Sequence, residues 1–159
     1  MVVNFNYTNT FEKLYGKYLK NKGITDTMYY HIHGSLNENN LVLGTQDLPS
    51  KDDPFRLFTK EYQRLHYKTN KDYQKLLHEL GKSNEQYITF HIIGHSLDKV
   101  DHKILNKILC HSVISSSIGD ITIYQYEGNE TLEIQKNIEK ILQYSFEERV
   151  SLTPLEDII

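Results

Sequence analysis

The stretch QYITFHIIG, residues 86–94, is almost continuously apolar and rich in β-branched residues. This pattern is typical of a strand covered on both faces in a parallel sheet, so we expect it to be a central strand. Further strand patterns alternate with helical patterns along the chain. Such alternation predicts an α/β protein with a mostly parallel sheet and flanking helices. The other expected strands are 2–7, 28–32, 41–44 and 121–126, and the tail 146–159 fits either a closing strand or a loop.

Helical periodicity fills the segments between these strands. Asn9 and Glu12 resemble a capping box, and the apolar spacing after them continues until Gly23 stops it. We expect a helical insertion at about 52–82, in which Thr69 caps the second helix. Two further helices are expected before and after the strand at 121–126. The expected apolar positions are Phe11, Leu14, Tyr15, Tyr18 and Leu19; Phe55, Phe58, Tyr62 and Leu65; Tyr73, Leu76, Leu77 and Leu80; Val100, Ile104, Leu105, Ile108 and Leu109; and Leu132, Ile138, Ile141 and Leu142.

Composition limits the classes of partner. A chain of 159 residues suits one domain over 1–159. The formal net charge of -3 and the pI near 6.2 disfavour nucleic acid and anionic membrane surfaces as partners. Cys110 is the only cysteine, which excludes an intrachain disulfide and fits a cytoplasmic location. No apolar run approaches the ~20 residues that span a bilayer.

Three polar clusters fall where predicted strands end. Ligands of parallel sheets bind at the carboxyl ends of the strands, so these clusters are the main functional signal. His31 and His33 occupy alternate positions of one predicted strand, which would place both imidazoles on the same face. The clusters are Asn4, Asn6 and Thr8; His31, His33 and Gly34; and Gly94, His95, Ser96, Asp98 and Asp101.

These side chains are open to more than one chemical interpretation. Imidazoles and carboxylates are ligands of zinc and other divalent ions, although their spacing does not define a site. Residues 94–98 also resemble the G-x-S-x-G elbow of serine hydrolases, with Asp98 in place of the second glycine. The candidate metal ligands are His31, His33, His91, His95, Asp98, Asp101 and His102, and we assign no metal to them.

A third interpretation is structural. Ser96 or Asp98 can cap the helix that follows, and the N-terminus of that helix can receive phosphate or ribose oxygens. Asp101 would interact favourably with the helix dipole, and His31 would be an ordinary strand residue. His33 precedes a strand-ending glycine, and there we favour a functional role.

Four segments together resemble the bacteriophage abortive-infection AbiH family: NFNYTNTFEKLY (4–15), YHIHGSL (30–36), NLVLGT (40–45) and IIGHSLDKVD (92–101). The resemblance covers most of the chain, with the last residues less distinctive. More distantly, the pattern is similar to sirtuin-like domains of bacterial defence proteins, in which corresponding motifs line one nucleotide pocket. This resemblance implies a Rossmann-like sheet and a role in phage defence, with a phage-derived trigger as a partner.

The resemblance also implies roles for particular residues. Asn6 matches the asparagine on the nicotinamide-ribose side of sirtuin-like enzymes, and His33 matches their catalytic histidine. Ser96 and Asp101 would lie on the adenosine or phosphate side, while His31, Gly34, Gly94 and Asp98 would complete the ligand-binding set. NAD or a related nucleotide would be the substrate, in an activity like that of NAD glycohydrolases. A non-enzymatic sensing or interaction module is the alternative.

The sequence departs from the sirtuin-like pattern in two places. Thr8 stands where sirtuin-like nucleotide hydrolases commonly have aspartate. No Gly-rich strand–loop–helix precedes Val2, so the chain resembles the C-terminal part of the family and lacks the usual first Gly-rich βα unit. A parallel sheet without that unit exposes a strand edge, and we therefore expect the chain to self-associate.

Overall fold

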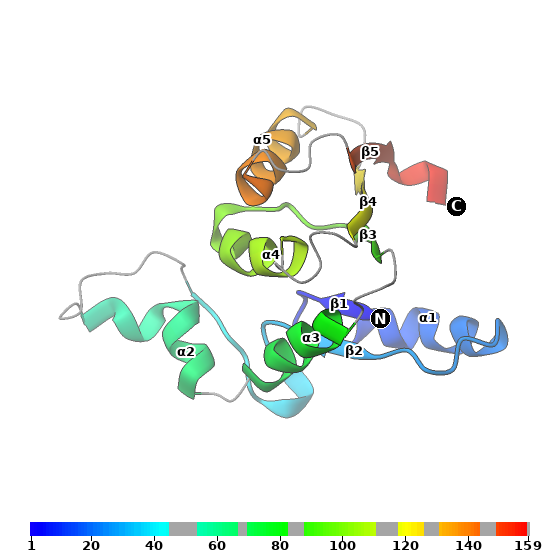
Figure 1. Cartoon of the computed structure of the whole chain (residues 1–159). Helices are drawn as coiled ribbons and strands as arrows, with labels where there is room; N and C mark the ends of the chain where they lie inside the picture. The colour runs from blue at the N-terminus through cyan, green and yellow to red at the C-terminus, as the bar shows by residue number, and fades with distance from the viewer. Residues whose placement is uncertain are drawn as a thin grey trace. The chain divides into compact units, whose positions relative to one another are not determined.

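The computed structural model describes residues 1–44, 54–66, 70–82, 88–110, 118–125, 131–143 and 149–158. The chain divides into two compact units, Met1–Leu76 and Leu77–Ile159, and the division falls within helix α3 (Asn70–Lys82) (Figure 1). A two-stranded parallel sheet lies in the first unit and a three-stranded parallel sheet in the second. The expected class, an α/β protein with a Rossmann-like, mostly parallel sheet, is confirmed. No helix in these described ranges is long and apolar enough to cross a membrane.

The first unit begins with a β–α–β arrangement. Strand β1 (Val2–Asn4) pairs in parallel with β2 (Tyr29–His31), and helix α1 (Thr10–Asn21) connects them. Both strands are shorter than the patterns at 2–7 and 28–32 predicted. β1 ends at Asn4 because that side chain folds the next residues into a loop, as described below.

Helix α1 differs from its prediction at the N-terminus and on its apolar face. The Asn9 side chain makes no capping hydrogen bond, so the predicted capping box is wrong. The C-terminal signal is confirmed: Gly23 has φ +78°, and its N–H donates to Lys20 O at 3.0 Å. No residue of α1 is fully buried, and three residues of its predicted apolar face are exposed: Leu14, Tyr15 and Tyr18.

Residues 41–44 do not form the predicted strand. Val42 N donates to His33 O at 2.8 Å, and Leu43 N donates to Gln63 Oε1 at 2.9 Å. The Tyr7 hydroxyl also donates to Val42 O at 3.3 Å. Two of these three hydrogen bonds involve side chains, so they do not form a sheet ladder.

The predicted helical insertion contains a 3₁₀ helix, η2 (Pro54–Phe58), then α2 (Lys60–His66) and α3. Tyr73, Leu76 and Leu80 of α3 are buried, as predicted, and Leu77 is half-buried. Phe55 and Phe58 are exposed, so the apolar face predicted for the first helix is not buried there. The Leu65 side chain and Thr69 lie outside what the structure describes.

The second unit contains β3 (Ile88–Ile93), α4 (His102–Leu109), β4 (Ile118–Gln125), α5 (Thr131–Leu142) and β5 (Val150–Pro154). The strand order is β3-β4-β5 and both pairings are parallel. Among the described residues of this unit, β4 is therefore the middle strand and β3 an edge strand, so the prediction that residues 86–94 form a central strand is wrong for this sheet. In the tail, which fitted a strand or a loop, Val150–Pro154 form strand β5 and Leu155–Ile158 form the 3₁₀ helix η5.

The core of the second unit lies between one face of this sheet and two helices. Ile121 and Ile123 of β4 are buried, and α4 and α5 lie on the same side of the sheet (Figure 1). Asn106 Nδ2 donates to Ile141 O at 2.6 Å and links the two helices. The buried helical residues are Ile104, Leu105, Ile108 and Leu109 of α4 and Ile134, Ile138, Ile141 and Leu142 of α5, whereas Leu132 is exposed and Val100 belongs to the 3₁₀ helix η3 (Lys99–Asp101).

The second face of β3 is open. Burial along β3 alternates between half-buried and exposed residues, and Ile93 is 54% exposed. The expectation of a strand covered on both faces is therefore wrong. On this face, the imidazole of His91 stacks on Tyr124, with ring centroids 5.8 Å apart.

Candidate functional site

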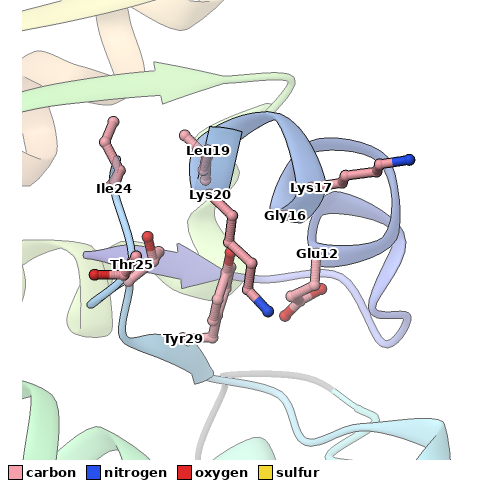
Figure 2. A pocket seen from close by; sticks show the side chains of 9 residues that line it. Glu12, Gly16, Lys17, Leu19, Lys20, Ile24, Thr25 and Tyr29 are labelled. Atoms are coloured by element: carbon pink, nitrogen blue, oxygen red, sulfur yellow. The ribbon is translucent and has the colours of Figure 1, made fainter. Parts of the chain in front are cut away.

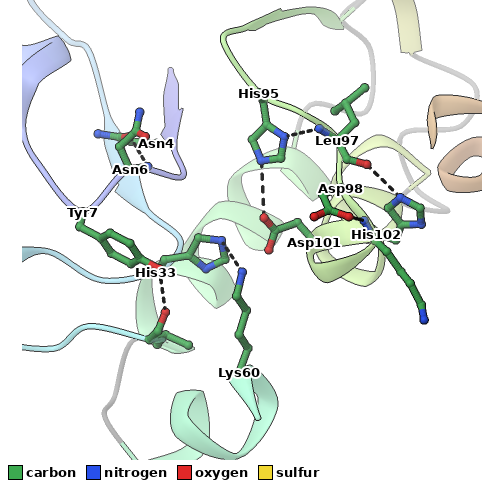
Figure 3. Close-up of polar contacts among 12 residues, drawn as sticks. Asn4, Asn6, Tyr7, His33, Lys60, His95, Leu97, Asp98, Asp101 and His102 are labelled. Carbon is green, nitrogen blue, oxygen red and sulfur yellow. Dashed lines mark hydrogen bonds and ion pairs between the residues drawn. The ribbon is translucent and has the colours of Figure 1, made fainter. Parts of the chain in front are cut away.

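The loop after β1 is organised by Asn4, whose side chain is buried (Figure 3). Its Nδ2 donates to Thr8 O at 3.0 Å, and its Oδ1 accepts from Asn6 N at 2.8 Å. These bonds satisfy backbone groups that have left the strand, so the asparagine replaces the sheet ladder locally. The Asn6 residue itself is exposed, so its amide is presented to solvent.

The turn after β2 separates the two histidines. The strand ends at His31, and Gly34 N donates back to His31 O at 3.2 Å. Because residues 32–33 belong to a turn, the alternation of faces along a strand no longer applies, and the expected shared face is wrong. Gly34 has φ +79°, and a Cβ atom there would lie 2.1 Å from Asn40 O. Only glycine fits this position without displacing the backbone.

The imidazole of His31 contacts helix α1. Its Nε2 lies 2.9 Å from Glu12 Oε1, and both side chains are largely buried. Glu12 was predicted to complete a capping box with Asn9. In the structure its carboxylate contacts His31 instead. The pair joins α1 to the end of β2.

His33 is 3% exposed and lies between two cationic side chains of α2. Its Nε2 is 3.4 Å from Lys60 Nζ, and its Nδ1 is 3.1 Å from Arg64 Nη2 (Figure 3 shows the lysine contact). Ammonium and guanidinium groups only donate hydrogen bonds, and a neutral imidazole has one accepting nitrogen. The ring can therefore accept from one cation at a time and directs an N–H toward the other.

Two aromatic side chains from the loop after β1 complete this group. Phe5 meets the His33 ring edge-on with centroids 5.4 Å apart, and Tyr7 lies 6.2 Å away at a tilt. The Tyr7 hydroxyl donates to Val42 O at 3.3 Å, and Leu36 N donates to Tyr7 O at 2.9 Å. We call Phe5, Tyr7, His33, Lys60 and Arg64 the His33 cluster.

Sequence reasoning missed Lys60 and Arg64. The sequence signal that could have paired them is their spacing of four residues in a helical segment, which places both cations on one helix face. Nothing in that spacing identified the imidazole that they meet. Arg64 also acts on Tyr73: burial raises the pKa of that phenol, and the charge of Arg64 offsets part of the rise.

In the second unit, the segment after β3 forms a separate polar group around His95. Leu97 N donates to His95 Nδ1 at 2.9 Å, so this nitrogen is the acceptor and Nε2 carries the proton. Nε2 lies 3.6 Å from Asp101 Oδ2, and Asp101 is 7% exposed. Both nitrogens of His95 are thus engaged, and the ring is poorly placed to activate a serine.

Of the other residues predicted in this segment, one caps a helix and another is exposed to solvent. Asp98 accepts from Lys99 N and caps η3, which supports the structural interpretation for Asp98. Ser96 is exposed, Gly94 has φ +62°, and His102 Nε2 donates to Leu97 O at 2.9 Å. Within the described ranges, no group of three or more His, Cys, Asp or Glu side chains is arranged to hold a metal ion.

The predicted site residues thus fall into two groups, one in each unit. The first unit brings the loop that contains Asn6 against the turn that contains His33 and Gly34, through Tyr7. The second unit brings His95, Leu97 and Asp101 together, with Gly94, Ser96 and Asp98 on the same segment.

The fold and the two polar groups together define the class of protein. It is an α/β protein with parallel sheets, and its candidate functional residues lie just after the ends of the strands. The family model for bacteriophage abortive infection AbiH matches residues 1–124, and the chain belongs to this family. The match confirms the resemblance seen in the four sequence segments and supports a role in abortive infection as a defence against phage. No curated protein and no solved structure matches the chain.

Proposed function

We propose that this AbiH protein acts in phage defence by binding NAD or a related nucleotide at the His33 cluster and cleaving its glycosidic bond. The observation that carries the proposal is the position of His33, buried between Lys60 and Arg64. Resemblance to sirtuin-like domains supplies the substrate class.

The chemistry of the cluster suits a nucleotide. Lysine and arginine bind phosphate oxygens through charge-assisted hydrogen bonds, and guanidinium groups do so with two parallel bonds. An anion bound beside the His33 ring would accept hydrogen bonds from Lys60 and Arg64. Phe5 and Tyr7 provide aromatic surface for an apolar or planar part of the ligand.

In the proposed reaction the bond between ribose C1′ and the nicotinamide nitrogen breaks, and its electron pair stays with nicotinamide. Water then bonds to C1′ and releases a proton. His33 holds a ribose hydroxyl or takes this proton, a role that suits an imidazole because its ordinary pKa lies near neutral pH. Asn6 orients the nicotinamide ribose. Roles in ligand binding for His31 and Gly34 belong to the same proposal. For Gly94, Ser96, Asp98 and Asp101 we propose ligand binding within the second unit.

The second candidate is a sensing or interaction module that binds a ligand without turnover. The observation that favours it is that both ring nitrogens of His33 already face cationic donors. A histidine held in this way is better suited to fixing a ligand or a fold than to moving a proton.

The deciding experiment incubates the purified chain with NAD and related nucleotides and follows nicotinamide release by mass spectrometry. His33→Ala is the test variant. His78→Ala is the matched control, because the His78 side chain is 68% exposed on α3. Release that is lost only in His33→Ala supports the enzyme. Nucleotide binding without release in the unmodified chain supports the module, and the absence of both overturns the nucleotide proposal.

A further inference from the structure

Residues 42–44 connect the turn that contains His33 to helix α2. On one side, Val42 N donates to His33 O at 2.8 Å. On the other side, Leu43 N donates to Gln63 Oε1 at 2.9 Å, and Gln63 belongs to α2. The segment that holds the backbone of His33 therefore also holds the helix whose cationic side chains face its ring.

The Gln63 side chain uses both ends of its amide in this connection. Its Oε1 accepts from Leu43 N, and its Nε2 donates to Leu57 O of η2 at 3.3 Å. An amide suits this role because it has both an acceptor and a donor, whereas a carboxylate only accepts. The side chain thus ties together α2, η2 and residues 42–44.

A close backbone approach at Gly44 adds to this connection. Gly44 has φ +135°, and a Cβ atom there would lie 1.9 Å from Phe58 O of η2. A side chain at this position would therefore displace η2 or the segment itself. Two separate contacts, one from an amide and one from a glycine, hold residues 42–44 against the chain that leads into α2.

Helix α2 needs such contacts because it is short. It has 7 residues, whereas isolated helices of fewer than about 12–15 residues are only marginally stable in water. Thr59 caps its N-terminus, since Thr59 Oγ1 accepts from Tyr62 N at 3.3 Å. The cap fixes where the helix begins, and Gln63 fixes the helix against its neighbours.

We propose that Gln63 is a positioning residue for the His33 cluster. By tying α2 to residues 42–44, it keeps Lys60 and Arg64 on the two nitrogens of the imidazole ring. A ligand then meets both cations already in place, so less conformational freedom is lost when it binds. The benefit to nucleotide binding rests on the proposed function, whereas the positioning itself does not.

The first test needs no nucleotide. Diethyl pyrocarbonate modifies accessible imidazoles, and mass spectrometry follows each histidine. His33 is buried, whereas the His78 side chain is 68% exposed and serves as the internal reference. Gln63→Met keeps the length of the side chain and removes both hydrogen bonds. We expect it to raise His33 modification about ten-fold, the effect of one or two neutral hydrogen bonds on a local opening. Gln74→Met, on an exposed glutamine of α3, is the matched control and should change nothing.

Gly44→Ala tests the same connection without touching Gln63. Its Cβ atom should displace η2 and raise His33 modification, whereas Gly23→Ala, where a Cβ meets nothing within 4 Å, should not. Both glycines have positive φ, so both variants introduce backbone strain. Urea unfolding shows that each variant is folded in the assay. Unchanged His33 modification in either folded test variant would overturn the proposal.

A triple variant separates positioning from a general loss of stability. The changes Lys60→Ala and Arg64→Ala together remove both cationic side chains from the ring. In that background, Gln63→Met should add nothing to the modification of His33. A further rise of the original size, as expected for independent sites, would show that Gln63 acts on something else and would overturn the proposal.

Calorimetric titration with NAD relates this role to the proposed function. We expect Gln63→Met to weaken NAD binding about ten-fold. A separate pocket of about 440 Å³ lies between α1 and residues 24–29 (Figure 2), and none of its lining residues belongs to α2, η2 or residues 42–44. If NAD bound there instead, Gln63→Met would raise His33 modification and leave NAD affinity unaltered. That result would overturn the proposed function at His33 and uphold the positioning role.

Discussion

Lys60 Nζ lies 3.4 Å from His33 Nε2, and the two residues are 7% and 3% exposed. A buried ammonium group needs hydrogen-bond acceptors. A neutral imidazole nitrogen is an acceptor without a negative charge, so it does not neutralise the positive charge of the lysine. The pair therefore keeps a cation close to the turn after β2. Arg64 on the other side of the ring adds a second one, and an anion is the natural ligand for such a group.

Removing the lysine charge should weaken nucleotide binding and leave the fold intact. Lys60→Met keeps the length of the side chain and loses its ammonium group. We expect NAD affinity to fall by about 10- to 100-fold, the range for one charge-assisted hydrogen bond. Calorimetric titration measures it, and Lys75→Met is the control because the Lys75 side chain is 66% exposed. Equal losses in both variants would contradict a local role for Lys60.

Gly34→Ala should destabilise the first unit more than Gly23→Ala. The two glycines have nearly the same φ, +79° and +78°, so an alanine suffers similar backbone strain at each. Only Gly34 has a backbone atom, Asn40 O, in the place of the new Cβ. We expect about 1–2 kcal/mol for Gly23→Ala and a larger loss for Gly34→Ala, measured by urea unfolding. Equal losses would show that the Asn40 backbone moves freely.

Asn4→Ala should loosen the loop after β1. The variant leaves Thr8 O and Asn6 N without the side-chain partner that they have now, at a cost of about 1–3 kcal/mol in the free energy of unfolding. Asn37→Ala, on an exposed asparagine, is the control. Amide hydrogen exchange should rise at Asn6 in the first variant alone. Unchanged exchange would mean that other contacts fix the loop.

Two isoleucines of one sheet should differ sharply on truncation. Ile123 is 1% exposed at the centre of β4, and Ile93 is 54% exposed at the end of β3. Ile123→Ala should cost about 2–5 kcal/mol in the free energy of unfolding, through lost burial and the cavity left behind. Ile93→Ala should stay within about 0.5 kcal/mol. A large loss at Ile93 would indicate that something covers this sheet face in solution.

Cys110 should make the stability of the second unit decrease at alkaline pH. Burial raises the pKa of its thiol, and Sγ donates to Ile141 O at 3.7 Å. The folded state therefore holds the proton more tightly than the unfolded state. The protonated thiol therefore adds to the free energy of unfolding. This contribution is complete below the thiol pKa of the unfolded state, about 8.5, and is lost as pH rises through the thiol pKa of the folded state.

Urea unfolding between neutral and alkaline pH tests this contribution. The difference in free energy between the unmodified chain and Cys110→Ala should shrink as pH rises. Alkylation of the native thiol should also be slower than alkylation in urea at the same pH, because the thiolate is the reactive form. A constant difference across this pH range would contradict the prediction.

Much of the fold was predictable because helical and strand periodicity are local properties. The alternation of elements, the parallel class and the stop at Gly23 all follow from residues close together in sequence. Strand order is not local. An apolar run such as 86–94 indicates a strand but does not say whether that strand has one neighbour or two, and so β3 was wrongly placed at the centre.

The candidate site was predictable only in part, for a similar reason. His33 and Gly34 stood out because the sequence pattern placed a glycine directly after a histidine at the predicted end of a strand. The shared face of His31 and His33 failed because the strand ended sooner than its pattern. Lys60 and Arg64 had no sequence signal that linked them to His33, since that contact depends on how α2 packs.

The parallel pairing of β3, β4 and β5 has a consequence for how this part of the chain is made. Ile88 pairs with Ile118, and Ile121 pairs with Val150, so β3 and β4 each wait for a partner that is synthesised after a whole intervening helix. Both described pairings of this sheet are parallel and neither is a hairpin, so each must first close a long loop. During translation, β4 therefore exposes one unpaired edge until β5 leaves the ribosome, and during this interval a chaperone or a second nascent chain has most access to it.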